Sequence, residues 1–247
     1  MEENITLLLK ALGLKGVLSA FEELTTSERK KLNHDIFATL LEREKAFRQS
    51  RSFMYRLDKA KLPQIKTLED FDFEESEMDK TQIETLLTAE FIAQHENIIL
   101  HGATGSGKSH IGSALAYKAI QLGYRVYFVK FTTLARNLLE ANSERDALRY
   151  MQRLQHFNLL VVDELGYQAI DKQAGVLLFE LFSACYEKNS LLITTHLEFK
   201  EWGDIFGNKK ATKAMIDRLT HHAQLIYTGE DSWRLRSKKS KSTNKKK

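Results

Sequence analysis

The sequence predicts an α/β protein in which a five-stranded parallel sheet is flanked by helices and preceded by a small all-helical amino-terminal domain. From Ile83 onward, short apolar runs alternate with helical patterns, which indicates parallel strands covered on both faces. Residues 1–66 show only helical spacing, and residues 237–247 form a low-complexity basic tail that we expect to be disordered. The predicted organisation is therefore a helical domain over 1–66, an α/β domain over 67–236 and the tail.

The amino-terminal domain is predicted from apolar residues spaced three and four apart. They indicate one short helix around Leu7–Leu12 and a second around Val17–Leu24. A long amphipathic helix with a basic outer side follows from Ile36 to Leu57. Pro63, the only proline in the chain, ends this region, because proline lacks the amide hydrogen that a helix interior needs.

An acidic segment, LEDFDFEESEMD, joins the two domains and has no helical period. We expect it to dock Phe71 and Phe73 onto the α/β domain. In that domain the apolar runs predict strands at 98–100, 126–129, 159–162, 191–194 and 225–227. Helices are predicted at 83–91, 138–157, 174–186 and 215–222, and a further helix is predicted to begin after the second strand with Thr132 as its cap.

The segment GATGSGKSH carries the full phosphate-binding loop pattern, and it lies between a predicted strand and a predicted helix, as that motif requires. Its glycines let successive backbone N–H groups point at phosphate oxygens, and the helix adds its positive amino-terminal end. Lys108 is placed to reach the β- and γ-phosphates of ATP, and the Ser109 hydroxyl to hold Mg²⁺. We therefore expect nucleotide contacts from Gly102, Ala103, Thr104, Gly105, Ser106, Gly107, Lys108, Ser109 and His110.

Two acids, Asp163 and Glu164, follow the apolar run LLVV. Acids at the carboxyl end of a buried parallel strand face the crevice where ligands bind in open α/β sheets. We expect Asp163 to position Mg²⁺ beside Ser109, and Glu164 to polarise the water that attacks the γ-phosphate. The second acid favours an ATPase over a kinase for a small molecule. The simpler alternative is a strand that ends in two solvated acids.

The composition is that of an ordinary globular protein, with a net charge of +4, a single cysteine and no apolar run that could span a membrane. We expect a cytoplasmic protein in which Cys185 is a buried thiol. The charge is uneven, because the amino-terminal third is partly basic and eight basic residues follow Asp231 without an acid. This pattern indicates a polyanionic partner, most simply nucleic acid, although a solvated charged face would look the same.

The two motifs, together with LEDFDFEES, LLITTHLEFKEW and AMIDRLTHHAQLI, resemble the IstB-like family, the ATP-binding helpers of bacterial insertion sequences, which are related to the DnaC/DnaI helicase loaders. The resemblance covers about residues 5–238. It implies an AAA+ ATPase core without a full lid domain, behind a helical amino-terminal domain. It further implies binding to duplex DNA with little sequence preference, ATP-dependent homo-oligomerisation and cooperation with a cognate transposase.

The resemblance also assigns roles to residues outside the two motifs. Arg218 matches the arginine that reaches the γ-phosphate of a neighbouring subunit. An intramolecular pair with Asp217 is the alternative. His196 stands where a polar sensor, often asparagine, ends the fourth strand, and Thr195 could share that task. Arg234 and Arg236 are more plausible as DNA contacts than as lid residues.

Two other functions share parts of this pattern. A replicative helicase loader would have the same fold and ATP chemistry, with single-stranded DNA and a helicase as its partners. A small-molecule kinase would need a substrate pocket and usually a lid, neither of which the sequence indicates. The histidine pair at 221–222 does not suggest a metal site, because adjacent residues of a helix do not face one ion.

Overall fold

The computed structural model describes residues 2–25, 27, 34–141, 143–206 and 209–230. The chain divides into two compact units, residues 1–55 and residues 56–247, and the boundary lies inside helix α4 (His34–Ala60). We call them the helical unit and the sheet unit. None of the described helices combines the length and apolar character needed to cross a membrane.

In the helical unit, α1 (Glu2–Ala11) and α2 (Lys15–Glu23) pack on each other, and α4 begins as the predicted long helix. The unit has its own small core, because the amphipathic helices bury their apolar faces together. This core contains Ile5, Leu8, Leu9, Leu12, Phe21 and Leu41. The Arg48 side chain of α4 donates a hydrogen bond of 2.6 Å to the carbonyl of Leu12, the residue after α1, and so links these two helices.

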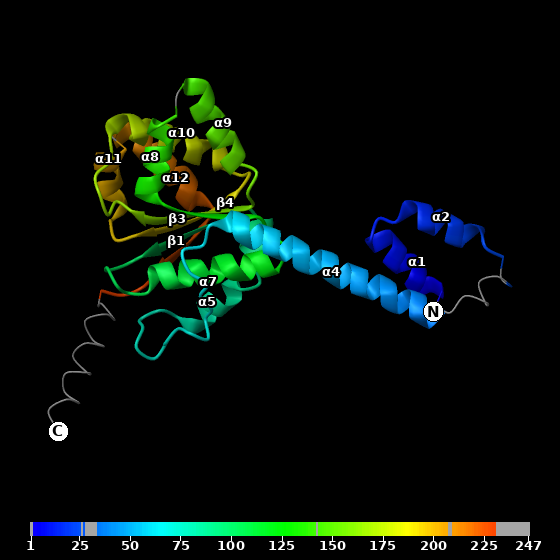
Figure 1. The fold of residues 1–247 in the computed structure, drawn as a ribbon. Helices are drawn as coiled ribbons and strands as arrows, with labels where there is room; N and C mark the ends of the chain where they lie inside the picture. The colour runs from blue at the N-terminus through cyan, green and yellow to red at the C-terminus, as the bar shows by residue number, and fades with distance from the viewer. Residues whose placement is uncertain (1, 26, 28–33, 142, 207–208, 231–247) are drawn as a thin grey trace. The chain divides into compact units, whose positions relative to one another are not determined.

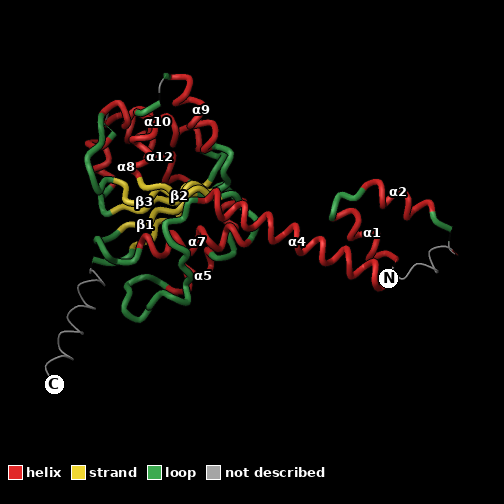
Figure 2. The backbone as a smooth tube through the Cα atoms, in the orientation of Figure 1, coloured by secondary structure: helices red, strands yellow, loops and turns green. Residues whose placement is uncertain are grey.

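The sheet unit contains the predicted five-stranded parallel sheet, in the order β2-β3-β4-β1-β5 (Figures 1 and 2). Its strands are mostly buried and rich in β-branched and leucine residues, as expected where helices cover both faces of a sheet. The strands are β1 (Asn97–His101), β2 (Val126–Lys130), β3 (Leu159–Leu165), β4 (Ser190–Thr195) and β5 (Ala223–Tyr227).

Helices cover the sheet on both sides, with α7 on one face and α8, α10 and α12 on the other (Figure 1). This is the layered arrangement that alternating strands and helices predict. The helices of the unit are α5 (Lys80–Leu86), α6 (Glu90–Ala93), α7 (Lys108–Gln121), α8 (Phe131–Leu139), α9 (Glu144–Leu154), α10 (Lys172–Cys185), α11 (Trp202–Ile205), α12 (Lys209–His221) and the 3₁₀ turn η1 (Phe199–Glu201).

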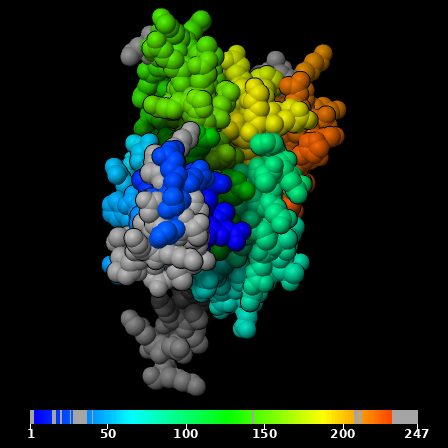
Figure 3. All heavy atoms as spheres, turned by 90° about the vertical axis from the view of Figure 1, so that its right-hand side faces the viewer, coloured from blue at the N-terminus to red at the C-terminus, as the bar shows by residue number. Residues whose placement is uncertain are grey.

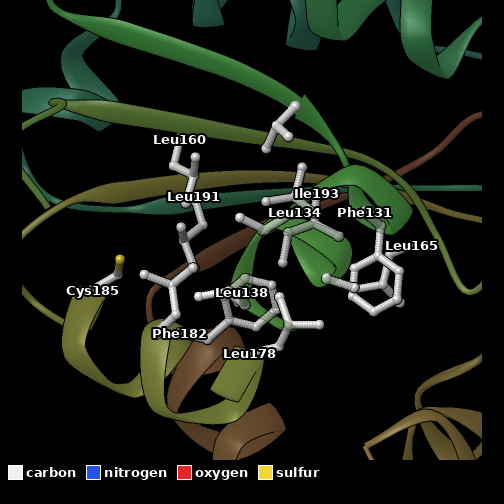
Figure 4. Close-up of a cluster of buried hydrophobic side chains, with 14 of the residues drawn as sticks. Phe131, Leu134, Leu138, Leu160, Leu165, Leu178, Phe182, Cys185, Leu191 and Ile193 are labelled. Carbon is white, nitrogen blue, oxygen red and sulfur yellow. The ribbon is translucent and has the colours of Figure 1, made fainter. Parts of the chain in front are cut away.

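The larger core lies between the sheet and the layer of α8, α10 and α12. Figure 4 shows side chains from β3 and β4, such as Leu160 and Ile193, meeting those of α8 and α10. Cys185 lies in this core with 1% of its surface exposed, as predicted, and burial raises the pKa of its thiol to about 12. Trp202 is fully buried and serves packing.

Four predicted helices differ from the structure. The predicted helix 83–91 is interrupted between α5 and α6, because Ala89 has a left-handed backbone with φ of 57°. The predicted helix 138–157 is wrong as one piece, since α8 ends at Leu139 and Ser143 caps a new helix by accepting the Asp146 N–H. A Ser or Thr side chain that bonds the backbone in this way starts a helix.

The helix after β2 begins at Phe131, so Thr132 lies in its first turn and does not cap it. The last predicted helix, 215–222, instead starts at Lys209 and ends at His221. The polar residues at its beginning gave no apolar period from which the sequence could predict them. The tail predicted over 237–247 lies outside the described residues.

Candidate functional site

The phosphate-binding loop connects β1 to α7, as predicted. Gly107 is the residue before the helix and has φ of 99°, a left-handed conformation that glycine adopts without strain. Residues 104–110 line a cleft of about 760 Å³. Gly102 and Ala103 lie outside the cleft lining, and their N–H groups donate to the carbonyls of Thr195 and Gly229. Thr104 to His110 are therefore the part of the loop that a nucleotide in the cleft can reach.

The Lys108 ammonium folds back over the loop. It donates to the carbonyl oxygens of Gly102 at 2.7 Å and Ala103 at 2.6 Å, and more weakly to Ser106 Oγ at 3.4 Å. Burial lowers the pKa of Lys108 to about 8, although the charge of Asp163 opposes this effect. Because carbonyls hold a cation less firmly than phosphates do, this lysine is available for a polyphosphate in the same cleft.

Asp163 is 3% exposed and accepts two hydroxyl hydrogen bonds on Oδ1. One comes from Ser109 at 2.8 Å and the other from Thr194 at 2.5 Å. The predicted pair of Ser109 and Asp163 is thus brought together from the start of α7 and from β3. Hydroxyl and carboxylate oxygens are the ligands that Mg²⁺ prefers beside nucleotide phosphates, so these residues fit that ion.

Glu164 lies within β3 at an irregularity in its pairing with β4, rather than beyond the strand end as predicted. Its backbone has φ of 63°, which is strained for a residue with a side chain. The strain is compensated by its N–H, which donates to Thr194 Oγ1 at 2.8 Å. Glu164 lines the cleft, and its carboxylate Oε2 lies 2.9 Å from the Nζ of Lys130, which lies outside the cleft lining. This bond raises the pKa of Lys130.

The acidic connector forms a wall of the same cleft. The Phe71 ring packs so closely on Gly107 that a Cβ there would lie 2.5 Å from Cε2, and it meets the His110 ring edge-on at 5.2 Å. His110 Nε2 forms a hydrogen bond of 2.9 Å with the Thr67 carbonyl. Phe73 packs on Phe71 at a ring distance of 4.8 Å. The predicted docking is therefore confirmed for Phe71, whose target is the loop itself, whereas Phe73 packs on Phe71.

The residues proposed as sensors lie at the end of β4. His196 is exposed, lines the cleft and meets the Tyr167 ring edge-on at 5.7 Å. Thr195 is buried, and its hydroxyl donates to the Leu165 carbonyl at 3.0 Å while accepting the Leu197 N–H. The Thr195 hydroxyl is thus occupied by hydrogen bonds within the fold. Of these two residues, His196 is the one whose side chain can move toward a bound nucleotide.

Arg218 lies on α12 and is exposed, outside the cleft lining. Within the described residues its side chain has no ion pair, so the alternative pairing with Asp217 is not formed there. The Arg218 side chain is therefore accessible at the surface of this chain. Arg234 and Arg236 lie outside the described residues.

Two residues of the site were missed by the sequence reasoning. Thr194 holds both acids, and Lys130 holds Glu164. Both lie at or near the carboxyl end of a predicted strand, and that position could have identified them, because the carboxyl ends of parallel strands share the ligand-binding edge.

The chain is similar to several known proteins. The family profile described as IstB-like ATP binding protein matches residues 7–242. The chain is 35% identical over 218 residues to a protein of Pseudomonas aeruginosa named as an ATP-binding protein of insertion sequence IS21, covering 87% of this chain and 82% of that one. It is 34% identical over 201 residues to a similarly named protein of insertion sequence IS5376 from Geobacillus stearothermophilus, covering 81% and 80%.

Solved structures with the same fold include those of DnaI and DnaA. DnaI is similar with a TM-score of 0.52 and 20% identity, over 66% of this chain and 90% of that chain. DnaA from Aquifex aeolicus, bound to AMPPCP, is similar with a TM-score of 0.56 and 19% identity, over 74% and 56%. At these identities the likeness shows the fold alone.

Proposed function

Since the chain belongs to the family of IstB-like ATP-binding proteins, we propose that it is a Mg²⁺-dependent ATPase that assists the movement of an insertion sequence. The observation that carries the ATP chemistry is the convergence of Lys108, Ser109 and Glu164 on one cleft, with Asp163 bonded to Ser109 behind its wall. A lone phosphate-binding loop is compatible with many reactions, but this loop faces a carboxylate that can activate water.

In this proposal each residue has one task. Residues 104–110 hold the phosphates of ATP through backbone N–H groups, and Lys108 neutralises their charge. Ser109 and Asp163 would hold Mg²⁺, which supplies charge stabilisation at the transferring phosphate. Glu164 orients the attacking water and accepts its proton. His196, exposed at the cleft, senses the γ-phosphate.

ATP would also bring subunits together. Arg218 is exposed on α12 and can complete the site of a neighbouring subunit, where an arginine stabilises the charge of the transition state. The assembly would form on duplex DNA and recruit or stimulate a transposase, and hydrolysis would reset it. The names of the relatives, which refer to insertion sequences, favour this role over loading of a replicative helicase.

The test measures ATP hydrolysis and particle size with and without duplex DNA, for the wild type and Glu164→Gln. Loss of a general base typically lowers the rate by ~10²–10⁴-fold. We expect Glu164→Gln to bind ATP, to lose hydrolysis by about that factor and to accumulate a DNA-bound assembly. Glu140→Gln is the matched control, because Glu140 is an exposed residue at the end of α8, outside the cleft lining, whose carboxylate lies 4.0 Å from Arg136.

Two results would contradict the proposal in different ways. Normal hydrolysis by Glu164→Gln would remove this residue as the base. A wild type that stays monomeric and ignores duplex DNA would remove the transposition role. Binding of a replicative helicase, but not of a transposase, in a pull-down would then favour the loader.

A further inference from the structure

Helix α9 carries three arginines on the side opposite the face that it buries. Ala147, Met151 and Leu154 are buried against the sheet unit. A helix turns 100° per residue, which places Arg145, Arg149 and Arg153 on the opposite side, where all three are exposed. Gln152 lies beside them, and Asp146 and the exposed Leu148 lie at the two borders of this face, whereas Glu144 lies farther round, toward Met151.

The spacing of the three arginines follows from their positions at i, i+4 and i+8. Each step along the helix axis is about 6 Å, so the row extends over about 12 Å. A duplex backbone presents a dense line of phosphates, each of which an arginine can bind through two N–H groups. A row of this length fits a few consecutive phosphates of one strand.

The local contacts leave these arginines available. Arg149 is 3.3 Å from Asp146, but both side chains are well exposed, and exposed pairs of this kind contribute little. Arg153 lies over the Tyr150 ring at 5.1 Å, which restrains its guanidinium without neutralising it.

The position of α9 is compatible with DNA binding while ATP is bound. None of its residues lines the nucleotide cleft. The helix rests on α8, and Figures 1 and 3 show it projecting at the edge of the sheet unit, with its outer side open. A long, stiff polyanion can therefore lie along it without meeting the phosphate-binding loop.

We infer that the face of α9 formed by Arg145, Arg149 and Arg153 is a duplex DNA-binding surface of the sheet unit, which contacts the phosphate backbone and reads no bases. The inference rests on the proposed function, because it locates the DNA contact that the function requires. It places that contact in the sheet unit, whereas the sequence alone pointed to the amino-terminal domain and the basic tail.

The test compares the full-length wild type with Arg145→Gln/Arg149→Gln/Arg153→Gln in duplex binding at several salt concentrations. Each lost phosphate contact lowers the slope of log K against log[salt] by about 0.9, so the triple variant should lose about 3 from the slope. The loss should be equal for unrelated duplex sequences. The matched control, Lys80→Gln/Lys172→Gln/Lys188→Gln, removes the same charge from exposed sites elsewhere and should keep the wild-type slope within about 1.

The single variants guard against misfolding, because each should lower the slope by about 1 on its own. The triple Arg→Lys variant should bind with nearly the wild-type slope, since it keeps the charge. ATP hydrolysis without DNA should be unchanged in all of them. An unchanged slope in the arginine variants, with a wild type that binds DNA, overturns the α9 surface and leaves the proposed function standing. Absence of DNA binding by the wild type overturns both.

Discussion

Lys130 Nζ lies 2.9 Å from Glu164 Oε2, which joins the last residue of β2 to the proposed catalytic base on β3. The neighbouring strands place them together, because Lys130 is paired in register with Asp163, the residue before Glu164. A carboxylate that accepts a bond from an ammonium group is a poorer base and is held away from a water molecule. The pair therefore restrains the step that we assign to Glu164.

Removal of this restraint should accelerate hydrolysis. We expect Lys130→Met, which keeps the length of the side chain without its charge, to raise the ATPase rate measured without DNA by about three- to tenfold, corresponding to about 1 kcal/mol for a partly exposed pair. Lys172→Met, at an exposed lysine outside the cleft, is the control. A Lys130→Met rate at or below that of the wild type would show that Lys130 does not restrain Glu164.

Thr194 holds the two acids with one hydroxyl, which donates to Asp163 and accepts the N–H of Glu164. Thr194→Val keeps the shape but leaves both groups without this partner in a buried site, which costs about 1–3 kcal/mol. We expect a lower denaturation midpoint in urea and weaker Mg²⁺-dependent ATP binding. Thr194→Ser retains the hydroxyl and should restore both properties. Equal stability and ATP binding in Thr194→Val and wild type would show that the bridge has no role.

The pH dependence of ATP binding should report Lys108, whose pKa is lowered to about 8 by burial. Above that pH the nucleotide-free protein loses the positive charge that the phosphates need, so the affinity for ATP should fall by up to tenfold per pH unit. Lys108→Arg, which stays charged, should show no such fall. Calorimetric titration between pH 7 and pH 9.5 measures the affinity for ATP. An affinity of the wild type that does not change with pH would contradict the lowered pKa of Lys108.

The same pKa has a consequence for stability with the opposite sign. Between about pH 8 and 10.5 the unfolded chain still binds the Lys108 proton that the folded protein has released. The contribution of Lys108 therefore increases the free energy of unfolding as pH rises through that range. Comparison of wild type with Lys108→Met isolates its contribution, and a wild type whose stability falls relative to Lys108→Met over this range would contradict the assignment.

Subunit mixing should test the role of Arg218. Arg218→Ala and Glu164→Gln are each expected to be nearly inactive alone. If Arg218 acts on the site of a neighbour, some interfaces in a mixture combine an intact Arg218 with an intact Glu164. With random mixing of equal amounts, these interfaces should restore ATPase activity to about a quarter of the wild-type value. This estimate takes each defective site to be ~10³-fold slower. A mixture no more active than the sum of its parts would contradict action between subunits.

The connector shows where prediction from sequence reached its limit. The apolar character of Phe71 and Phe73 in an acidic segment was enough to predict that they dock. That Phe71 lies on Gly107, and that the Thr67 carbonyl bonds His110, depended on where the chain passes after α4. Contacts between segments about 40 residues apart leave no periodic signal in either one.

The sequence by itself determined the strands, the phosphate-binding loop and the acids that face it. These follow from local chemistry, because apolar runs must be buried and a loop around phosphate needs glycines, a lysine and a hydroxyl in fixed spacing. The tertiary structure decided the rest. The order of the strands brings Lys130 and Thr194 to the two acids, and Glu164 takes a left-handed backbone conformation within β3. The arginines of α9 share one exposed side because Ser143 caps a separate helix and three apolar residues of that helix are buried on its other side.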